Sequence, residues 1–208
     1  MKDKSRHTAK NNTTVNILLS GVGGQGIIIA GTILTEVAMK AGMDVKKSEV
    51  HGMSQRGGTV VSQVRYGEKI HSPLIQKGKA DIILAFEKLE SVRFLECLKP
   101  GGFVIYNSVE IIPLTVYSSD VQYPKDIKTI CREKTDKVFS VHASDYLKPL
   151  GNGKILNTIM LGVLSQFLEF DEDIWLDTII SRVPPQTVDA NRKAFEVGRE
   201  INVGKSLL

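Results

Sequence analysis

The chain has 208 residues, of which 42% are hydrophobic and 24% charged, and its formal net charge is +4. This length and composition predict one α/β domain that buries a substantial core. The first fourteen residues hold four lysine or arginine side chains against one aspartate, so most of the excess charge belongs to a basic tail over 1–14 that we expect to be disordered. The remainder is nearly neutral, which argues against a nucleic-acid-binding protein.

The sequence also argues against a membrane protein and against a disulfide-stabilised protein. No apolar stretch approaches the roughly 18 residues that span a bilayer, and no apolar segment follows the charges at the N-terminus. We therefore expect a cytoplasmic protein without membrane contact. Cys97 and Cys131 stand far apart without a Cys-x-x-Cys partner, so we expect free thiols and no metal site. Two thiols also cannot supply the four thiolates of a [4Fe–4S] cluster.

The first predicted elements are a strand, a glycine-rich turn and a helix. Val15 to Ser20 is a short apolar run, and Gly21, Gly23 and Gly26 then satisfy the pattern Gly-x-Gly-x-x-Gly. In that pattern the glycines allow a tight turn, close approach of a diphosphate and close packing of helix on strand. The apolar residues that follow recur at helical spacing: Ile27, Ala30, Leu34, Val37 and Ala41.

This turn is a candidate anion site. A strand that enters a helix through glycines leaves the first backbone N–H groups of the helix without partners. We therefore expect Gly21, Gly23, Gly24, Gln25 and Gly26 to bind an anionic group. The same spacing occurs in tight turns that bind nothing, so the strand-to-helix context is what favours a ligand.

Asp44 to Val50 predicts a second strand, which would complete a βαβ unit. Dinucleotide-binding folds place a carboxylate at the end of that strand to bind a ribose hydroxyl, and the candidate here is Glu49. Two lysines come just before Glu49, and an unusual loop from His51 to Gly58 follows it. A simple dinucleotide site does not require such a loop.

The loop combines polar side chains with three glycines in eight residues. That composition lets backbone amides approach a ligand or another chain closely. We expect Ser54, Gln55, Arg56, Gly57 and Gly58 to take part in binding, since a planar guanidinium grips phosphate or carboxylate with two hydrogen bonds. The alternative is a surface turn with a solvated arginine.

Further strands extend the sheet. Thr59 to Tyr66 alternates as a strand does, and Ile70 to Leu74 is predicted to return antiparallel as a hairpin. Asp81 to Phe86 is typical of a buried parallel strand. Glu87 and Glu90 follow it, but carboxylates are favoured in a first helical turn by the helix dipole. We therefore assign no catalytic residue.

The later segments continue to alternate between strand and helix. Strands are predicted over Phe103 to Asn107 and Phe139 to His142, with a short one around Leu114 to Tyr117. Gly151 to Phe167 is apolar and favours a buried helix in which Asn157 has a packing role.

Two more helices complete the pattern. Asp171 is predicted to cap a helix over Glu172 to Ser181, and Pro184-Pro185 to begin the last helix. Without a repeat or linker, the sequence predicts one domain over 15–208. We expect an α/β Rossmann-like three-layer fold with a mostly parallel sheet plus an antiparallel hairpin.

Several landmarks together resemble the gamma-type subunits of the 2-oxoacid:ferredoxin oxidoreductases, most closely the beta subunits of the indolepyruvate type. The resemblance covers Asn16 to Glu200. Its landmarks, in order, are Gly21-Val22-Gly23-Gly24-Gln25-Gly26, Ser54-Gln55-Arg56-Gly57-Gly58, the strand and turn Asp81 to Glu90, Pro100-Gly101-Gly102 before a strand ending at Asn107, and Gly151-Asn152 followed by Asn157 and Gly162.

The resemblance implies one subunit of an enzyme that decarboxylates a 2-oxoacid oxidatively to an acyl-CoA and reduces ferredoxin. Thiamine diphosphate, magnesium and [4Fe–4S] clusters would lie on a large alpha subunit, the expected partner. This chain would be inactive alone, would help to form the active site and would receive coenzyme A. Whether the glycine loops bind coenzyme A or dock the partner stays open, because both tasks use the same residue types.

Two other functions agree with parts of the sequence. A self-sufficient NAD(P)-dependent dehydrogenase would use Glu49, or Lys46 and Lys47, at the nucleotide ribose, but the chain leaves little room for a second domain. A non-catalytic assembly protein would use the glycine loop only for packing.

Overall fold

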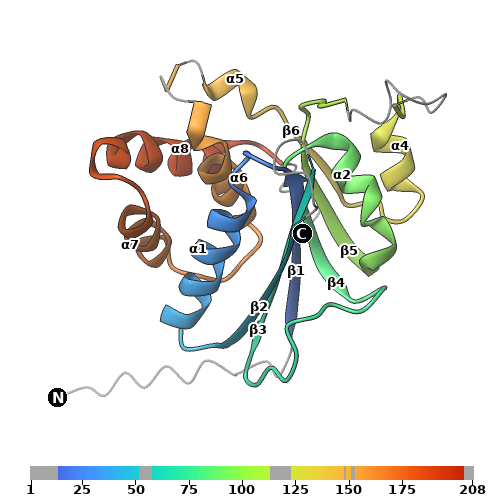
Figure 1. Ribbon diagram of the computed structural model, residues 1–208, viewed down its shortest axis with the longest axis horizontal. Coiled ribbons are helices and arrows are strands. Elements are labelled where there is room, and N and C mark those ends of the chain that lie inside the picture. Colours follow the sequence, from blue (N-terminus) through green and yellow to red (C-terminus); the bar gives the residue numbers. More distant parts are fainter. Residues whose placement is uncertain (1–13, 52–57, 113–122, 148, 151–152, 204–208) are drawn as a thin grey trace.

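The computed structural model describes residues 14–51, 58–112, 123–147, 149–150 and 153–203. A six-stranded sheet lies between two layers of helices (Figure 1). Its strands are β1 (Val15–Val22), β2 (Asp44–His51), β3 (Thr59–Gly67), β4 (Ala80–Ala85), β5 (Leu98–Asn107) and β6 (Val138–Val141). The α-helices are α1 (Ile27–Lys40), α2 (Lys88–Arg93), α4 (Ile127–Arg132), α5 (Ser144–Leu147), α6 (Leu156–Ser165), α7 (Glu172–Arg182) and α8 (Val188–Glu200). Short 3-10 helices cover Leu95–Cys97, Gly153–Ile155 and Pro185–Thr187.

The strand order is β2-β3-β1-β4-β5-β6. β1, β4, β5 and β6 run parallel, whereas β3 runs antiparallel to both of its neighbours, β1 and β2. The parallel strands therefore end at one edge of the sheet, where the ligand crevice of open α/β folds lies. The predicted three-layer α/β fold with a mostly parallel sheet is confirmed.

The structure refines one detail of the predicted sheet and corrects another. β2 follows β1 through α1 and runs parallel to it, as predicted, but the two strands do not pair, because β3 lies between them and β2 forms the sheet edge. Ile70 to Leu74 does not pair with β3 as a hairpin strand, because β1 and β2 already occupy both sides of β3. The segment is instead held through side chains, since the Ile70 N–H bonds to the Asp44 carboxylate at 2.7 Å and the Ile75 N–H bonds to Gln63 Oε1 at 2.6 Å.

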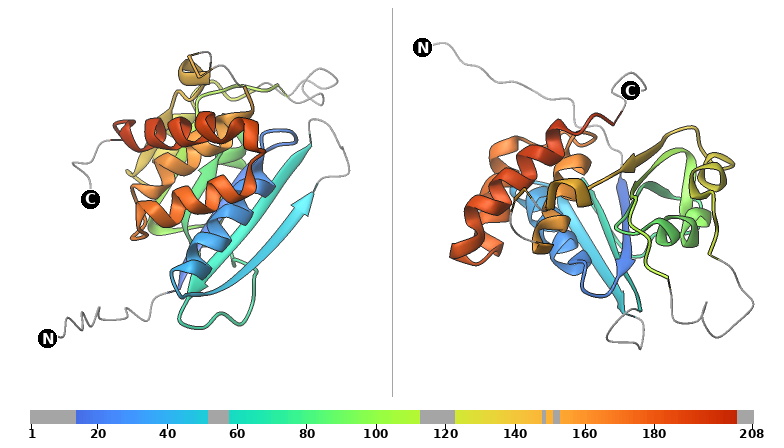
Figure 2. Two further views of the ribbon diagram at one scale, coloured as in Figure 1. Left: turned by 90° about the vertical axis from the view of Figure 1, so that its left-hand side faces the viewer. Right: turned by 90° about the horizontal axis from the view of Figure 1, so that it is seen from above.

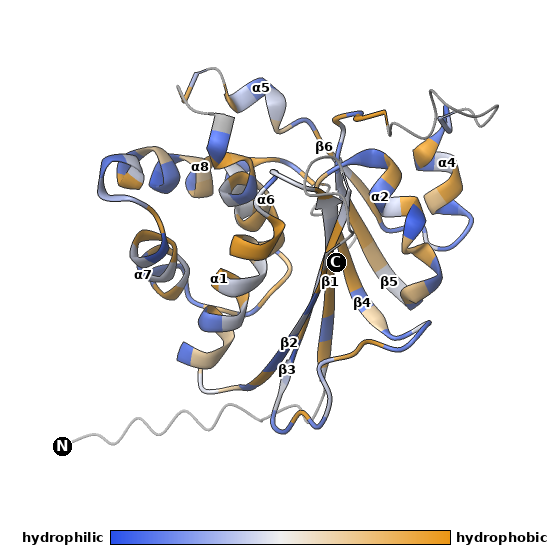
Figure 3. Cartoon of the chain, in the orientation of Figure 1, coloured by the Kyte–Doolittle hydropathy of each residue, from blue (hydrophilic) through white to orange (hydrophobic). Residues whose placement is uncertain are grey.

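The two faces of the sheet carry separate apolar clusters. α1, α6, α7 and α8 cover one face, while α2 and α4 cover the other (Figures 1 and 2). Alternation along β4 shows why, because Ile82 and Leu84 join the first cluster and Ile83 and Ala85 join the second. β1 and β4 are correspondingly apolar over most of their length (Figure 3), as strands buried on both faces are.

The C-terminal helices follow the sequence predictions with small differences. α6 is buried on every side from Asn157 to Ser165, because it packs against both the first cluster and α8. Asp171 precedes α7 as expected, but its side chain makes no capping hydrogen bond. Pro185 begins a 3-10 turn that leads into α8. The predicted strand around 114–117 and residues 1–13 of the predicted tail over 1–14 lie outside the described residues.

Candidate functional site

The predicted glycine turn is an open loop between β1 and α1. Gly24 and Gly26 have φ values of +99° and +80°, the left-handed region that glycine enters without steric cost. Gly24 is exposed, and Gly23, Gln25 and Gly26 are half-buried. The loop therefore reaches the surface at the carboxyl edge of the sheet.

Internal contacts fix the shape of this loop. The Gln25 carboxamide accepts the Val22 N–H at 2.8 Å and donates to the Phe86 carbonyl at 2.9 Å. Gly21 lies beneath it, where an added Cβ would come within 2.9 Å of Gln25, Ile27 and Phe86 atoms. Both ends of the Gln25 carboxamide are thus bonded to the backbone, and the packing around Gly21 leaves no space for a side chain at that position.

The N-terminus of α1, which no side chain caps, follows this loop at the surface. The first bond of the helical ladder runs from the Ala30 N–H to the Gly26 carbonyl at 3.0 Å, so the N–H groups of Ile27, Ile28 and Ile29 precede it. Gly26, the N-cap, supplies no side chain to bind them, and no acidic residue occupies the first turn. These N–H groups and the helix dipole favour an anion at this position.

The second predicted loop meets the first through its last residue. The Gly23 N–H bonds to the Gly58 carbonyl at 3.0 Å, so the structure brings Gly58 beside the glycine turn. The other residues predicted in this loop lie outside the described part of the chain: Ser54, Gln55, Arg56 and Gly57. Their participation stays a prediction.

Glu87 and Glu90 support the base of these loops. Glu87 is the N-cap of α2, where its carboxylate accepts the Glu90 N–H at 3.1 Å and the Tyr123 hydroxyl at 2.6 Å. Glu90 accepts the Thr59 hydroxyl at 3.0 Å and Arg93 Nε at 3.1 Å. Burial raises the pKa of the Glu90 carboxyl, against the lowering effect of Arg93. Both carboxylates are buried, so they hold α2 and the start of β3 rather than face a substrate.

The elements of a dinucleotide ribose site do not assemble. Glu49 lies on β2 at the sheet edge, separated from β1 by β3, and forms an ion pair with Lys47 at 2.7 Å. A dinucleotide-binding fold needs the carboxylate on a strand parallel to β1 and next to it. Nothing in this geometry favours the dehydrogenase alternative.

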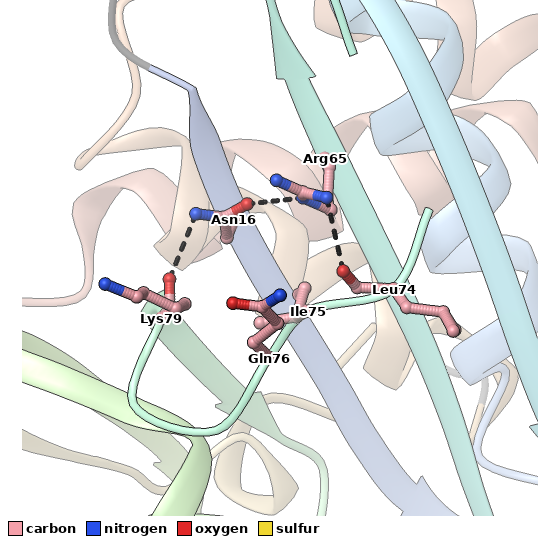
Figure 4. Close-up of a pocket in the computed structure, with 6 residues that line it drawn as sticks. All are labelled: Asn16, Arg65, Leu74, Ile75, Gln76 and Lys79. Carbon is pink, nitrogen blue, oxygen red and sulfur yellow. Dashed lines mark hydrogen bonds between the residues drawn. The ribbon is translucent and has the colours of Figure 1, made fainter. Parts of the chain in front are cut away.

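A hollow lies at the other end of β1 from the glycine turn (Figure 4). It encloses about 250 Å³ and is lined by Asn16, Arg65, Leu74, Ile75, Gln76 and Lys79. Arg65 donates from Nε to Asn16 Oδ1 at 2.7 Å and from Nη1 to the Ser72 carbonyl at 2.7 Å. The Asn16 amide in turn donates to the Lys79 carbonyl at 3.0 Å. These bonds fasten the segment after β3 to the sheet, which gives the hollow a structural role.

The described residues contain no group of three or more His, Cys, Asp or Glu side chains able to hold a metal ion. Cys97 and Cys131 are both free thiols, as the sequence predicts. No helix within the described ranges has the length and apolar character needed to cross a membrane.

One residue beside the loop was not predicted to belong to a site. Asn157, in the first turn of α6, lies so close to Gly26 that an added Cβ on the glycine would come within 3.1 Å of the carboxamide. The sequence signals were a polar residue inside an apolar helix, which indicates packing as readily as binding, and the place of Asn157 among the landmarks of the family resemblance.

Comparisons with known proteins place this geometry in context. The chain matches the family described as pyruvate ferredoxin/flavodoxin oxidoreductase over residues 16–201. It is 39% identical to the indolepyruvate oxidoreductase subunit IorB of Thermococcus kodakarensis, over 93% of this chain and 97% of that protein. The 2-oxoglutarate synthase subunit KorC of Methanothermobacter marburgensis is 26% identical, over 89% of this chain and 95% of its own length. The gamma subunit of a keto/oxoacid ferredoxin oxidoreductase from Geobacter sulfurreducens aligns with a TM-score of 0.69 and 25% identity, over 90% of this chain and 95% of that one.

Proposed function

Because this chain belongs to the pyruvate ferredoxin/flavodoxin oxidoreductase family, we propose that it is the smaller subunit of a 2-oxoacid:ferredoxin oxidoreductase. Its substrate is indolepyruvate or another aryl pyruvate, which the enzyme decarboxylates oxidatively to an acyl-CoA. The observation that carries this proposal is the similarity to indolepyruvate oxidoreductase subunits over 93% of the chain. The fold and the open glycine loop agree with it.

The redox groups of this reaction do not fit the present chain. A [4Fe–4S] cluster takes four thiolates, whereas the whole sequence contains two cysteines, one of them buried. We therefore assign thiamine diphosphate, its magnesium ion and the iron–sulfur clusters to a large partner subunit. The chemistry of electron transfer belongs to those groups. The small subunit forms part of the wall of the active site, helps to orient the reactants and provides a substrate site.

The site contribution rests on the two glycine loops. The N–H groups at the start of α1 would receive the diphosphate of coenzyme A, since a helix N-terminus favours negative charge. Gly58 ties the second loop to the first through Gly23, which would bring Arg56 near the same group. Arg56, with Ser54 and Gln55, would either bind coenzyme A or dock the large subunit.

Co-expression with the large subunit tests the proposal. We expect a brown heteromeric complex that reduces a viologen dye or ferredoxin when indolepyruvate and coenzyme A are supplied. The chain purified alone should be colourless and inactive. Activity from the isolated chain would contradict the assignment of the redox cofactors to the large subunit. Micromolar binding of NADH to the isolated chain would favour the dehydrogenase alternative. As a control, replacing both cysteines by serine should leave the iron content of the complex unchanged.

Arg56→Ala tests the second loop within that complex. We expect either an apparent KM for coenzyme A raised about tenfold, since a charge-assisted hydrogen bond is lost, or a failure to assemble. Size-exclusion chromatography with steady-state kinetics separates the two results. A fully assembled enzyme with unchanged kinetics would remove Arg56 from the site.

A further inference from the structure

The strongest unexplained feature beside the glycine loop is the side chain of Asn157. It is the second residue of α6 and only 7% exposed. A Cβ placed on Gly26 would lie 3.1 Å from its Cγ and Nδ2 atoms. The carboxamide therefore occupies the space directly beside the N-cap of α1, where a side chain at position 26 would otherwise lie.

The hydrogen bonding of Asn157 differs from that of comparable asparagines. Asn107 donates to the Phe86 carbonyl and accepts the Ala143 N–H, while Asn191 donates to the Thr187 carbonyl and accepts the Thr158 hydroxyl. Asn157, similarly buried, forms no hydrogen bond with its carboxamide to any described residue. Burying a polar group without a partner costs about 1–3 kcal/mol, so such groups ordinarily have one.

The carboxamide of Asn157 keeps access to the outside. The polar atoms that the described part of the chain seals from solvent without a hydrogen bond include Ser62 Oγ and Gln166 Oε1, but neither polar atom of Asn157 is among them. A partner for Asn157 can therefore arrive from solvent, beside Gly26, the N-cap of α1.

The two helices that meet here share an unusual electrostatic character. Neither α1 nor α6 has an acidic residue in its first turn or a side chain that caps it. In the described part of the chain, every other α-helix has an acidic first turn or an acidic cap: α2, α4, α5, α7 and α8. The positive ends of α1 and α6 thus approach each other without a neutralising carboxylate of their own.

We propose that Asn157 is a ligand-binding residue of the glycine-loop site, whose carboxamide donates to a diphosphate held at the N-terminus of α1. A diphosphate suits this arrangement because its two phosphoryl groups offer oxygens to two sets of donors, the helix N–H groups on one side and Asn157 on the other. The identification of that diphosphate as part of coenzyme A rests on the proposed function.

The first test measures binding without catalysis. Inorganic diphosphate is titrated calorimetrically into the complex with the large subunit, for the parental chain and for Asn157→Asp. The aspartate keeps the shape of asparagine but replaces the donor with a negative charge, so we expect affinity to fall at least about tenfold. Equal binding to both proteins would overturn the proposal, as would a parental complex that does not bind diphosphate.

The second test uses the reaction to identify the ligand. Asn157→Asp should raise the KM for coenzyme A at least about tenfold with little change in kcat. It should leave kcat/KM for pantetheine, an acceptor that lacks the diphosphate, within about twofold of the parental value. Equal losses with both acceptors would mean that Asn157 acts on the general shape of the site, which contradicts the proposal.

Two further variants serve as controls for these measurements. Asn157→Leu has similar size and no hydrogen-bonding group, so it should weaken diphosphate binding even if the aspartate variant does not assemble. Asn191→Asp alters a buried asparagine that is already paired, and it should lower stability without changing the KM for coenzyme A. If the parental complex binds diphosphate through Asn157 but does not oxidise 2-oxoacids, the proposed function fails and this inference stands.

Discussion

At the residue scale, Gly26 is subject to two separate constraints. Its φ is +80°, and an added Cβ would lie 3.1 Å from the Asn157 carboxamide. Gly42, just beyond the end of α1, has nearly the same φ of +81°, but no atom lies within 4 Å of its added Cβ. A comparison of the two glycines therefore separates the energetic cost of a left-handed backbone from the cost of steric crowding by Asn157.

Replacing each glycine by alanine should destabilise the protein to different extents. Gly42→Ala introduces only left-handed strain, which costs about 1–2 kcal/mol. Gly26→Ala adds the displacement of Asn157 and should cost at least about 1 kcal/mol more. Urea unfolding of the two variants beside the parental chain measures both losses. Equal losses would show that Asn157 moves aside freely.

Single residues also show how far sequence reasoning reaches into the site. A glycine pattern predicts where backbone can approach a ligand, because the requirement is local. The direction of a side chain is not local. Gln25 was expected to face a ligand, yet its carboxamide bonds to Val22 and Phe86, and Phe86 reaches it only through the pairing of β4 with β1.

At the scale of elements, the backbones of α6 and α8 approach each other closely where the two helices cross. A Cβ on Gly162 would lie 2.3 Å from the Phe195 carbonyl oxygen, and one on Gly198 would lie 2.2 Å from the Ile159 carbonyl oxygen. The obstructing atoms are backbone atoms, which cannot rotate away. The spacing of the two helices is thus set by glycine, and α6 in turn positions Asn157.

Gly162→Ala should therefore lower the free energy of unfolding by about 1–3 kcal/mol or more, since overpacking forces the helices apart. Gly31→Ala in α1 is the matched control, because its added Cβ meets the Ser62 side chain, 2.2 Å from Oγ and 3.0 Å from Cβ, rather than backbone. Both substitutions gain about 1 kcal/mol of helix propensity, and rotation of the Ser62 hydroxyl relieves part of the clash, so Gly31→Ala should destabilise the protein less than Gly162→Ala. Thermal unfolding by circular dichroism compares them, and similar stabilities would refute the rigid crossing.

The strands and helices themselves were easier to predict than the way in which they pair in the sheet. The apolar runs and helical periodicities predicted the strands and helices because those patterns depend on nearby residues. The neighbour of β2 is a strand from later in the chain, because β3 lies between β1 and β2. No local pattern in 44–50 indicates this arrangement, so the sequence did not predict that β3 would separate the two strands of the βαβ unit.

At the scale of the whole molecule, two apolar clusters share one sheet. Trp175, the single tryptophan of the chain, is fully buried in the cluster beneath α1, α6, α7 and α8. Cys131 is fully buried in the cluster beneath α2 and α4. Since β1, β4 and β5 supply side chains to both clusters, loss of the sheet should remove both together.

We therefore expect one cooperative unfolding transition. Tryptophan fluorescence should report the first cluster, and pulse labelling of the Cys131 thiol should report the second, in a Cys97→Ser background that leaves one reactive cysteine. Their midpoints in urea should coincide. Midpoints that differ beyond experimental error would show that the two faces of the sheet unfold as separate units.

The fold class, most of the elements, the glycine turn and the family resemblance could all be predicted from the order of the amino acids. Each of these depends on local spacing or on landmarks in a fixed order, which are properties of the linear chain. The match to a known family over 16–201 confirms the resemblance.

Only the tertiary structure decided which surfaces meet. It placed β2 at the sheet edge, joined Gly58 to Gly23, directed Gln25 inward and brought Asn157 to the N-terminus of α1. The physical reason is that these contacts join segments far apart in the chain. Their partners are selected by packing the two helical layers on a shared sheet, and no periodicity within a single segment encodes that choice.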